Sequence, residues 1–507
     1  MECIVIMPTE IIKIDFSGGW QPDWIPGEAP EGTLAECKNL YPEDDYYKPV
    51  KSVVNYSSTG VTGTALSGRE FRDTNGAFHA FVFTTTAIYR LAGDGTLTDI
   101  TNVGGSYGNA GDNWSAIAYG DWIIATNYND NMQILKGMTE SNFAALAGSP
   151  PKAKFLLFHS GYLLAANLVE TAVGYPKKVR WSALENVEDW TASLTTGSDA
   201  QDLADATGNI TGMVVVGDGF AIFHEESITT GRFIGAPYTF SFKANAITGI
   251  GAIKGTPISV NGVAYFWDNK DIYMFNGTQA IPIGGGVRKA VLYNLDANNL
   301  HRITVSYNRY KGIIMWSYPT TASDGTPDKI LCYNITSKRF THIDLLHQCF
   351  FIFNTNNIVT DIDSDALNAL YSGYIDDFPD NYDFDNPRWS ANVLTNSIVS
   401  AVSPYKIACF TGDAMVGEII TSSKRLADNI LYINRLRPNI VNKTNISAGT
   451  WTKMFENETG IYTEVYIGAS GYADFRASGR FASIKLTMGD HDGIMSCDVF
   501  GQTRGKR

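Results

Sequence analysis

The chain has 507 residues, a formal net charge of −13 and a sequence pI near 5.0. Its length exceeds what one compact core usually holds, and its hydrophobic content of 44% excludes a disordered chain. The acidic charge argues against a protein that coats duplex DNA, because such a protein needs a basic face for the phosphates.

The composition favours strands over helices. Tyr, Phe, Trp, Thr, Ile and Val are frequent, and the 48 glycines fall mostly between apolar runs. That pattern is typical of many short strands joined by tight turns. No long window places apolar residues at helical spacing, and no window approaches the ~18 apolar residues of a transmembrane helix.

The charge is unevenly distributed along the chain. Residues 386–507 contain 14 Lys and Arg against 10 Asp and Glu, a net charge of +4, which leaves −17 for residues 1–385. We therefore expect the two parts to face different neighbours. The six cysteines are scattered without a CxxC pair, and we expect reduced, mostly buried thiols. The start of the chain has no basic n-region, so we expect no signal peptide and synthesis in a cytosol.

Residues 1–60 are predicted to be an extended arm. Phe16–Trp20 is followed by three prolines, Pro22, Pro26 and Pro30, and two aromatic segments follow around Tyr41 and Tyr47. Prolines at this density oppose helix and central-strand pairing. Because the aromatics still need burial, we expect the arm to pack on its own propeller or on a neighbouring subunit.

Residues 61–385 contain a loose repeat, in which a turn glycine precedes an aromatic–aliphatic strand. The glycines are Gly120, Gly161, Gly219, Gly262 and Gly312, spaced by 41, 58, 43 and 50 residues. Phe78–Phe83 is predicted to be an earlier copy and Phe350–Phe353 the start of a later one. The widest gap holds Tyr175–Trp190, where Val179–Ser182 alternates like a half-buried strand and a polar turn ends at Trp190.

A period of 40–50 residues with about four strands per unit indicates β-propeller blades. One four-stranded blade cannot bury both faces alone, whereas blades packed around an axis cover each other. We predict an all-β fold with a degenerate propeller of about 6–7 blades. Stacked β-sandwiches are the alternative.

Residues 386–507 do not continue the sequence repeat, and they are predicted to form a β-sandwich with a basic tail. Its strands are expected at Ile407–Phe410, Glu418–Thr421, Ile430–Ile433, Thr463–Ile467 and Phe481–Leu486. Two pairs of arginines lie beside these strands, and guanidinium pairs suit carboxylates on an acidic neighbour. We therefore predict interface residues at Arg435, Arg437, Arg476 and Arg480.

Motifs for catalysis or cofactor binding are not found in the sequence. There is no GxSxG elbow, Walker loop or HExxH pattern, so we predict no enzyme and no cofactor. Asp361, Asp363 and Asp365 have the alternate spacing of a calcium loop, but the glycine and the terminal glutamate of an EF-hand are missing. A solvated acidic loop is the favoured interpretation, and a metal site there is the weaker one.

The combination of a Gly-Gly-Trp and proline-rich arm, the Arg180-Trp181-Ser182 and Asp189-Trp190 segment, a degenerate propeller and an arginine-bearing C-terminal sandwich resembles the tail hub or nozzle proteins of short-tailed bacteriophages. These are also described as packaged-DNA stabilisation proteins. The resemblance implies a virion protein made in the bacterial cytoplasm. It further implies a homohexameric ring around a DNA conduit for genome retention and ejection, with contacts to a portal or adaptor and to tail fibres or spikes.

Two other functions are kept open. A glycan-binding or glycan-cleaving propeller, acting as a receptor-binding tail component, would use aromatic side chains such as Trp114, Trp267 and Trp316 to stack on sugars, although alternation favours core positions for them. A cellular propeller scaffold is the other.

For the tail protein, we expect acidic walls to repel phosphates, so that DNA slides through without sequence-specific binding.

Overall fold

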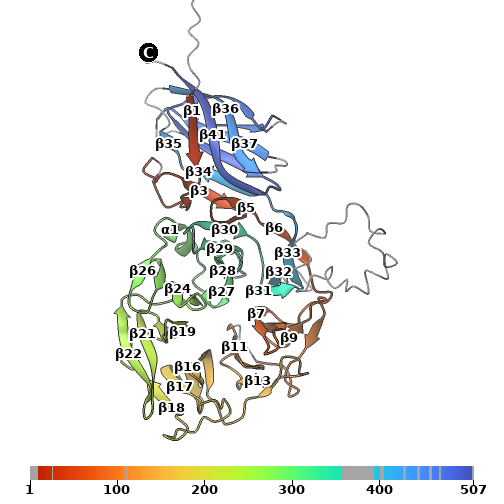
Figure 1. The fold of residues 1–507 in the computed structure, drawn as a ribbon, viewed down its shortest axis with the longest axis vertical. Coiled ribbons are helices and arrows are strands. Elements are labelled where there is room, and N and C mark those ends of the chain that lie inside the picture. Colours follow the sequence, from red (N-terminus) through yellow and green to blue (C-terminus); the bar gives the residue numbers. More distant parts are fainter. Residues whose placement is uncertain are drawn as a thin grey trace, which may run out of the picture. The chain divides into compact units, whose positions relative to one another are not determined.

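The structure is a computed structural model that describes residues 10–25, 27–108, 112–355, 393–399, 405–425, 430–441, 446–455, 459–467 and 470–504. Within them the fold is all-β apart from the short helix α1 (Arg288–Leu292) and the 3-10 turn η1 (Leu300–Arg302) (Figure 1). None of the helices in this part of the chain has the length and hydropathy of a membrane span. The predicted all-β class and blade pattern are confirmed.

Two compact units contain the blades and the sandwich. Unit 1 combines Met1–Val53, Gly249–Leu346 and Phe410–Arg507, and unit 2 combines Val54–Thr248 with His347–Cys409. The predicted boundary at residue 60 lies inside unit 2, which begins at Val54, and residue 385 lies outside the described residues. Each unit is assembled from segments far apart in the sequence.

Four antiparallel sheets of four strands follow one another in unit 2, and we call them the first to fourth blades. The first contains β7 (Ala65–Arg72), β8 (Phe78–Thr84), β9 (Ile88–Leu91) and β10 (Leu97–Asp99), and the second β11 (Ser115–Tyr119), β12 (Trp122–Thr126), β13 (Gln133–Leu135) and β14 (Ala144–Ala145). The third contains β15 (Lys152–His159), β16 (Tyr162–Glu170), β17 (Val173–Trp181) and β18 (Asp199–Asp202), and the fourth β19 (Ile210–Val216), β20 (Gly219–His224), β21 (Ser227–Gly235) and β22 (Thr239–Thr248).

Three further blades complete the set. The fifth contains β23 (Ile258–Val260), β24 (Val263–Trp267), β25 (Ile272–Phe275) and β26 (Ala280–Pro282), and the sixth β27 (Thr304–Asn308), β28 (Ile313–Tyr318), β29 (Lys329–Asn334) and β30 (Phe340–Asp344). The seventh pairs β31 (Cys349–Thr355), β32 (Val393–Val399) and β33 (Ile407–Ala414) with β6 (Lys51–Asn55), from the N-terminal part of the chain.

The predicted repeat corresponds to the second strand of a blade. In five blades the glycine motif starts this strand: it begins β12, β16, β20, β24 and β28. Gly161 and Gly262 have positive φ angles of 83° and 78° in the hairpin before it, a conformation that glycine adopts without steric cost. The sequence repeat is therefore the turn chemistry of one hairpin.

In unit 2 each blade shares a buried core with its neighbours. Successive clusters join the seventh blade to the first, the first to the second, the second to the third and the third to the fourth. Packing of single meanders on both faces is the arrangement of propeller blades, not that of separate sandwiches.

The sandwich in unit 1 has two sheets with a common core of 37 buried residues that also includes the fifth and sixth blades. One sheet has the order β39 (Ala473–Gly479), β36 (Ile430–Val441), β41 (Gly493–Arg504), β5 (Tyr47–Pro49) and β4 (Leu40–Pro42), with β1 (Glu10–Asp15) beside β41. The other continues from β30 of the sixth blade through β3 (Thr33–Lys38), β34 (Gly417–Thr421), β40 (Phe481–Met488), β37 (Ile446–Lys453) and β38 (Ile461–Tyr466), with β2 (Gly19–Trp20) beside β3 and β35 (Lys424–Arg425) beside β40.

Two predictions about this sandwich need correction. The N-terminal arm is not irregular, since β3 is a central strand that pairs with both β30 and β34. Its prolines oppose pairing only where they occur, and Pro22 and Pro30 lie in the loop before β3. The predicted sandwich strand Ile407–Phe410 belongs to the seventh blade instead, where Ala408 lies opposite Ile398 of β32.

The predicted burial of the thiols is confirmed for the cysteines that the structure describes. Cys37, Cys332, Cys349, Cys409 and Cys497 are buried, and Cys37, Cys332 and Cys497 are free. Burial raises the pKa of Cys37, Cys332 and Cys497, so these thiols stay protonated at neutral pH.

Candidate functional site

The candidate site lies in unit 2, between the long β17–β18 connection and the β21–β22 hairpin. The connection, residues 182–198, lies in the widest gap of the sequence repeat. Trp190 anchors it: the indole is fully buried, its Nε1 donates to Val187 O at 2.9 Å, and its carbonyl accepts from Arg180 at 2.6 Å. The connection is therefore fixed on the core of the third blade.

The β21–β22 hairpin rests on a cluster of aromatic rings. Phe240 of β22 contacts Tyr162, Trp181 and Phe220, with ring centroids 5.3–5.6 Å apart. Phe233 lies opposite Phe240 across the hairpin, at 5.9 Å. Ring pairs at these distances add stability beyond the area they bury, so the hairpin is held in a defined position.

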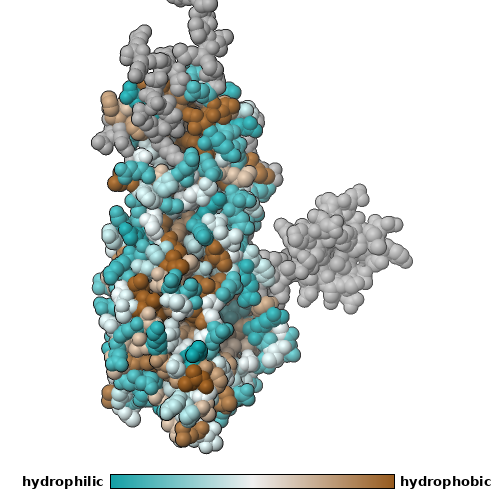
Figure 2. Space-filling view, turned by 60° about the vertical axis from the view of Figure 1, so that its left-hand side comes forward, coloured by the Kyte–Doolittle hydropathy of each residue, from teal (hydrophilic) through white to brown (hydrophobic). Residues whose placement is uncertain are grey.

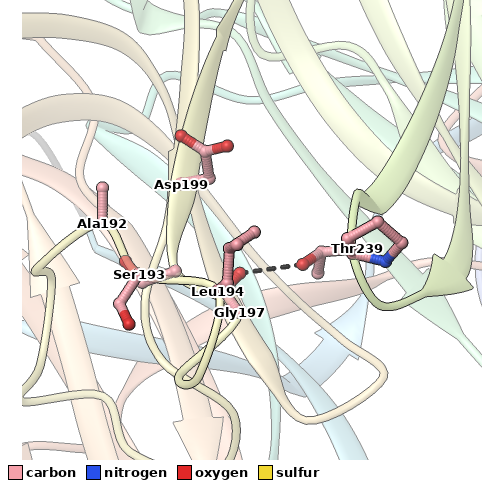
Figure 3. A pocket seen from close by; sticks show the side chains of 8 residues that line it. Ala192, Ser193, Leu194, Gly197, Asp199 and Thr239 are labelled. Atoms are coloured by element: carbon pink, nitrogen blue, oxygen red, sulfur yellow. Dashed lines mark hydrogen bonds between the residues drawn. The ribbon is translucent and has the colours of Figure 1, made fainter.

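A small open pocket of ≈ 220 Å³ separates the connection from the hairpin. Figure 3 shows Ala192, Ser193 and Leu194 on one side and Thr239 on the other, with the Thr239 hydroxyl donating to Gly197 O at 2.9 Å. The Ser198 hydroxyl donates to Trp181 O at 2.9 Å. The charged residue of the lining is Asp199, which is exposed. The pocket lining thus combines one carboxylate with a backbone that the Thr239 and Ser198 hydrogen bonds hold in place.

Large apolar side chains are exposed around this pocket. Leu194 is 80% exposed and Tyr238 75%, and Phe233 and Ile234 are also exposed. Figure 2 shows hydrophobic residues reaching the surface in several places on the face drawn. We call Leu194, Phe233, Ile234, Tyr238 and Asp199 the hairpin surface. Apolar groups gathered beside polar ones mark an interaction site more often than scattered ones do.

The β17–β18 connection lies in an acidic stretch, whereas the β21–β22 hairpin on the other side of the pocket carries the exposed Arg232. Residues 181–231 contain nine Asp and Glu and no Lys or Arg. Lys136 neutralises Glu188 at 2.8 Å, whereas Asp199, Asp202 and Asp205 are exposed. The local charge therefore favours a cationic partner.

The four predicted interface arginines lie in the sandwich. Arg435, Arg437 and Arg476 are exposed, while Arg480 is partly buried. Arg435 pairs with Asp474 of the neighbouring strand at 2.6 Å and, like Arg437, lies over the Tyr472 ring. The structure thus brings Arg435 and Arg437 together. It gives Arg435 an intramolecular partner that the sequence did not predict.

The other predicted positions lie either outside the described residues or in the core. Asp361, Asp363 and Asp365 lie outside the described residues. Among the described residues, no three His, Cys, Asp or Glu side chains gather closely enough to hold a metal ion. Trp114, Trp267 and Trp316 are buried, so they are core residues and do not stack on a glycan.

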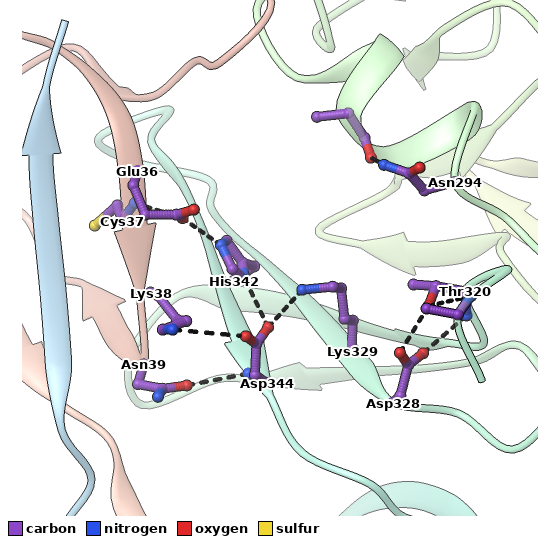
Figure 4. A network of polar contacts seen from close by, with 12 residues as sticks. Glu36, Cys37, Lys38, Asn39, Asn294, Thr320, Asp328, Lys329, His342 and Asp344 are labelled. Carbon is purple, nitrogen blue, oxygen red and sulfur yellow. Dashed lines mark hydrogen bonds and ion pairs between the residues drawn. The ribbon is translucent and has the colours of Figure 1, made fainter.

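A charged network around the buried His342 in unit 1 has no counterpart among the residues predicted from the sequence. His342 of β30 contacts Glu36 of β3 at 2.5 Å through Nε2 and Asp344 at 3.1 Å through Nδ1, and Lys329 donates to Asp344 at 2.6 Å (Figure 4). Glu36 and His342 are 306 positions apart, and no spacing rule links such residues.

The network carries shifted pKa values. Burial alone would lower the pKa of His342, but its hydrogen bonds to Asp344 and Glu36 and their charges outweigh burial and raise it. Burial likewise opposes the shifts of Glu36 and Asp344, whose pKa values are lowered by the His342 hydrogen bond and charge. The His342 ring, between two carboxylates, therefore joins β3 to β30.

Comparisons with known proteins give no family for this chain. No family model and no curated protein matches it. Among solved structures it is similar to a streptogramin B lyase, with 8% identity, a TM-score of 0.41 and coverage of 71% of this chain and 97% of that one. It is also similar to virginiamycin B lyase from Staphylococcus aureus (10% identity, TM-score 0.37, 58% and 88% coverage) and to the computationally designed Ika8 protein (8% identity, TM-score 0.35, 77% and 99% coverage). Likeness at this level assigns no activity.

Proposed function

We propose that this protein is a structural subunit of a bacteriophage tail hub or nozzle ring, which forms a conduit for genome retention and ejection. The observation that carries the proposal is that unit 1 and unit 2 each present a separate surface suited to protein contacts. The hairpin surface of unit 2 is apolar and acidic. The sandwich of unit 1 presents exposed arginines on β36 and β39.

A closed ring needs two different surfaces on every subunit. In a heterologous contact, one patch of a subunit meets a different patch of the next, and the ring closes when the rotation matches. Two unlike surfaces on one chain satisfy this requirement. The resemblance of the arm, blades and arginine-bearing sandwich to tail hub proteins supports the same function.

An exposed strand edge suits a further partner. β38 is the last strand of its sheet, and Ile461 and Tyr466 on it are 74% and 82% exposed. A free edge with exposed apolar side chains accepts an added strand from another protein. In the proposed assembly this partner is the portal or adaptor, or a tail fibre or spike.

The net charge of −13 fits a conduit. Acidic walls repel phosphates and prevent the genome from adhering during passage. An electron cryo-microscopy map of the assembly tests this point, and a basic or apolar lumen would contradict it.

Co-assembly with purified portal and adaptor proteins of a short-tailed phage tests the proposed function. We expect a stable complex in size-exclusion chromatography with light scattering. A glycan array with the same protein tests the alternative: specific glycan binding at micromolar concentration, together with no complex, would replace the tail ring by a receptor-binding propeller.

A further inference from the structure

We infer that the hairpin surface is one half of the contact between two copies of this chain, and that the other half is the outer face of β36 and β39 with Arg437 and Arg476. This inference rests on the proposed function, because it names the two surfaces through which the ring closes. The occupant of the pocket is then a second copy of the chain.

The first argument is the size of the pocket. Its ≈ 220 Å³ is below the roughly 300–1,000 Å³ of sites that enclose small-molecule ligands. A pocket of this size, open on one side and backed by the fixed Thr239–Gly197 contact at 2.9 Å, suits one protruding side chain of a protein partner.

The second argument is the charge of the pocket rim. The exposed Asp199 carboxylate accepts the backbone N–H of Ala200 at 2.8 Å and remains open to a cation. No Lys or Arg occurs between Arg180 and Arg232. Asp199 is the charged residue of the pocket lining, so a cationic group of a partner would gain a favourable ion pair there.

The third argument is the availability of the arginines. Arg435 is paired with Asp474, whereas no ion pair involves Arg437 or Arg476 within the described ranges. Both are exposed on the same sheet as Arg435. A planar guanidinium binds a carboxylate through two parallel hydrogen bonds, and Asp199 provides the carboxylate at the pocket.

Charge reversal in both halves tests the inference. We expect Asp199→Lys to weaken self-association by roughly tenfold or more in analytical ultracentrifugation, because it places like charges opposite each other. The double variant Arg437→Glu with Arg476→Glu should have a similar effect. Combining all three changes should restore association to within about threefold of the wild type.

Two matched variants serve as controls. Asp218→Lys reverses an exposed charge on the β19–β20 turn, and Tyr310→Ser removes an exposed ring in unit 1. Neither should change association, whereas Tyr238→Ser should weaken it. All substituted side chains are exposed, and circular dichroism confirms that each variant folds.

The outcomes separate the two proposals. If the wild type forms a ring and Asp199→Lys or the arginine variant has no effect, the inference is wrong and the proposed function stands. If Asp199→Lys abolishes adaptor binding but leaves the ring intact, the occupant is the adaptor and the inference is also wrong. A wild type that stays monomeric alone and with portal and adaptor overturns both.

Discussion

At the scale of single residues, His342 shows how an isolated polar residue joins two parts of unit 1. Its ring is 4% exposed, and both nitrogens contact carboxylates. Lys38 and Lys329 face the same Asp344 carboxylate, at 3.9 Å and 2.6 Å. With Glu36, Asp344, Lys38 and Lys329 charged, the network has no net charge when His342 is neutral and one positive charge when His342 is protonated.

This arrangement predicts a pH-dependent stability. His342 has a raised pKa in the folded state, so its contribution is fully present below about pH 6.5 and is lost as the pH rises through the raised value. Glu36 and Asp344 have lowered pKa values, so their contributions are present above about pH 4.3 and are lost on acidification.

We therefore expect His342→Gln to destabilise the protein by about 2 kcal/mol near pH 5.5, because hydrogen bonds to charged groups are lost. The difference from the wild type should shrink above pH 7. Thermal unfolding of both proteins across this pH range measures it. A difference that is constant between pH 5 and 9 would show that His342 is neutral in the fold.

Gly68 is a second residue with a specific requirement. A Cβ at this position would lie 2.2 Å from the Phe351 ring, where the first and seventh blades pack. We expect Gly68→Ala to cost about 1–3 kcal/mol in unfolding free energy through overpacking. Gly285→Ala is the matched control, because a Cβ there meets nothing within 4 Å. Equal unfolding free energies for the two variants would contradict the packing of these blades.

At the scale of elements, the repeat was predictable and the pairing across the chain was not. Gly161 and Gly262 identified second strands because each has a positive φ angle in the hairpin that precedes such a strand. The strand pairing of residues 10–55 depends on partners hundreds of positions away, such as Thr421 opposite Leu34. Local signals such as Pro22 and Pro30 therefore suggested an arm where the fold has central strands.

Hydrogen exchange tests this placement of β3. We expect slow amide exchange in β3, because it pairs on both sides, and faster exchange in β38, which is paired on one side only. Mass spectrometry of peptides covering Thr33–Lys38 and Ile461–Tyr466 measures both. Fast exchange throughout residues 10–55 would favour the loose arm that the sequence suggested.

The candidate site was predicted only in part, because its surface depends on how segments far apart in the sequence pack together. The insertion after Gly161 and the arginines were visible as patterns. The exposure of Leu194 and Tyr238 depends on how the connection folds around Trp190. The run of 51 residues without Lys or Arg was a signal that could have located the site.

At the scale of the whole molecule, the charge asymmetry gains a physical meaning. Asp199 of the hairpin surface belongs to residues 1–385, which are acidic overall. The exposed arginines of the sandwich belong to residues 386–507, which are basic overall. If opposite charges steer subunits together, assembly should be faster at low salt. Stopped-flow light scattering at 50 mM and 500 mM NaCl checks this, and a rate independent of salt would argue against electrostatic steering.

The proposed function requires this chain to close into a ring. Native mass spectrometry of the purified protein tests this requirement, because it gives the number of subunits. We expect one closed species, six subunits for a tail hub, without larger open polymers. A protein that stays monomeric across the accessible concentrations, alone and with portal and adaptor proteins, would contradict it.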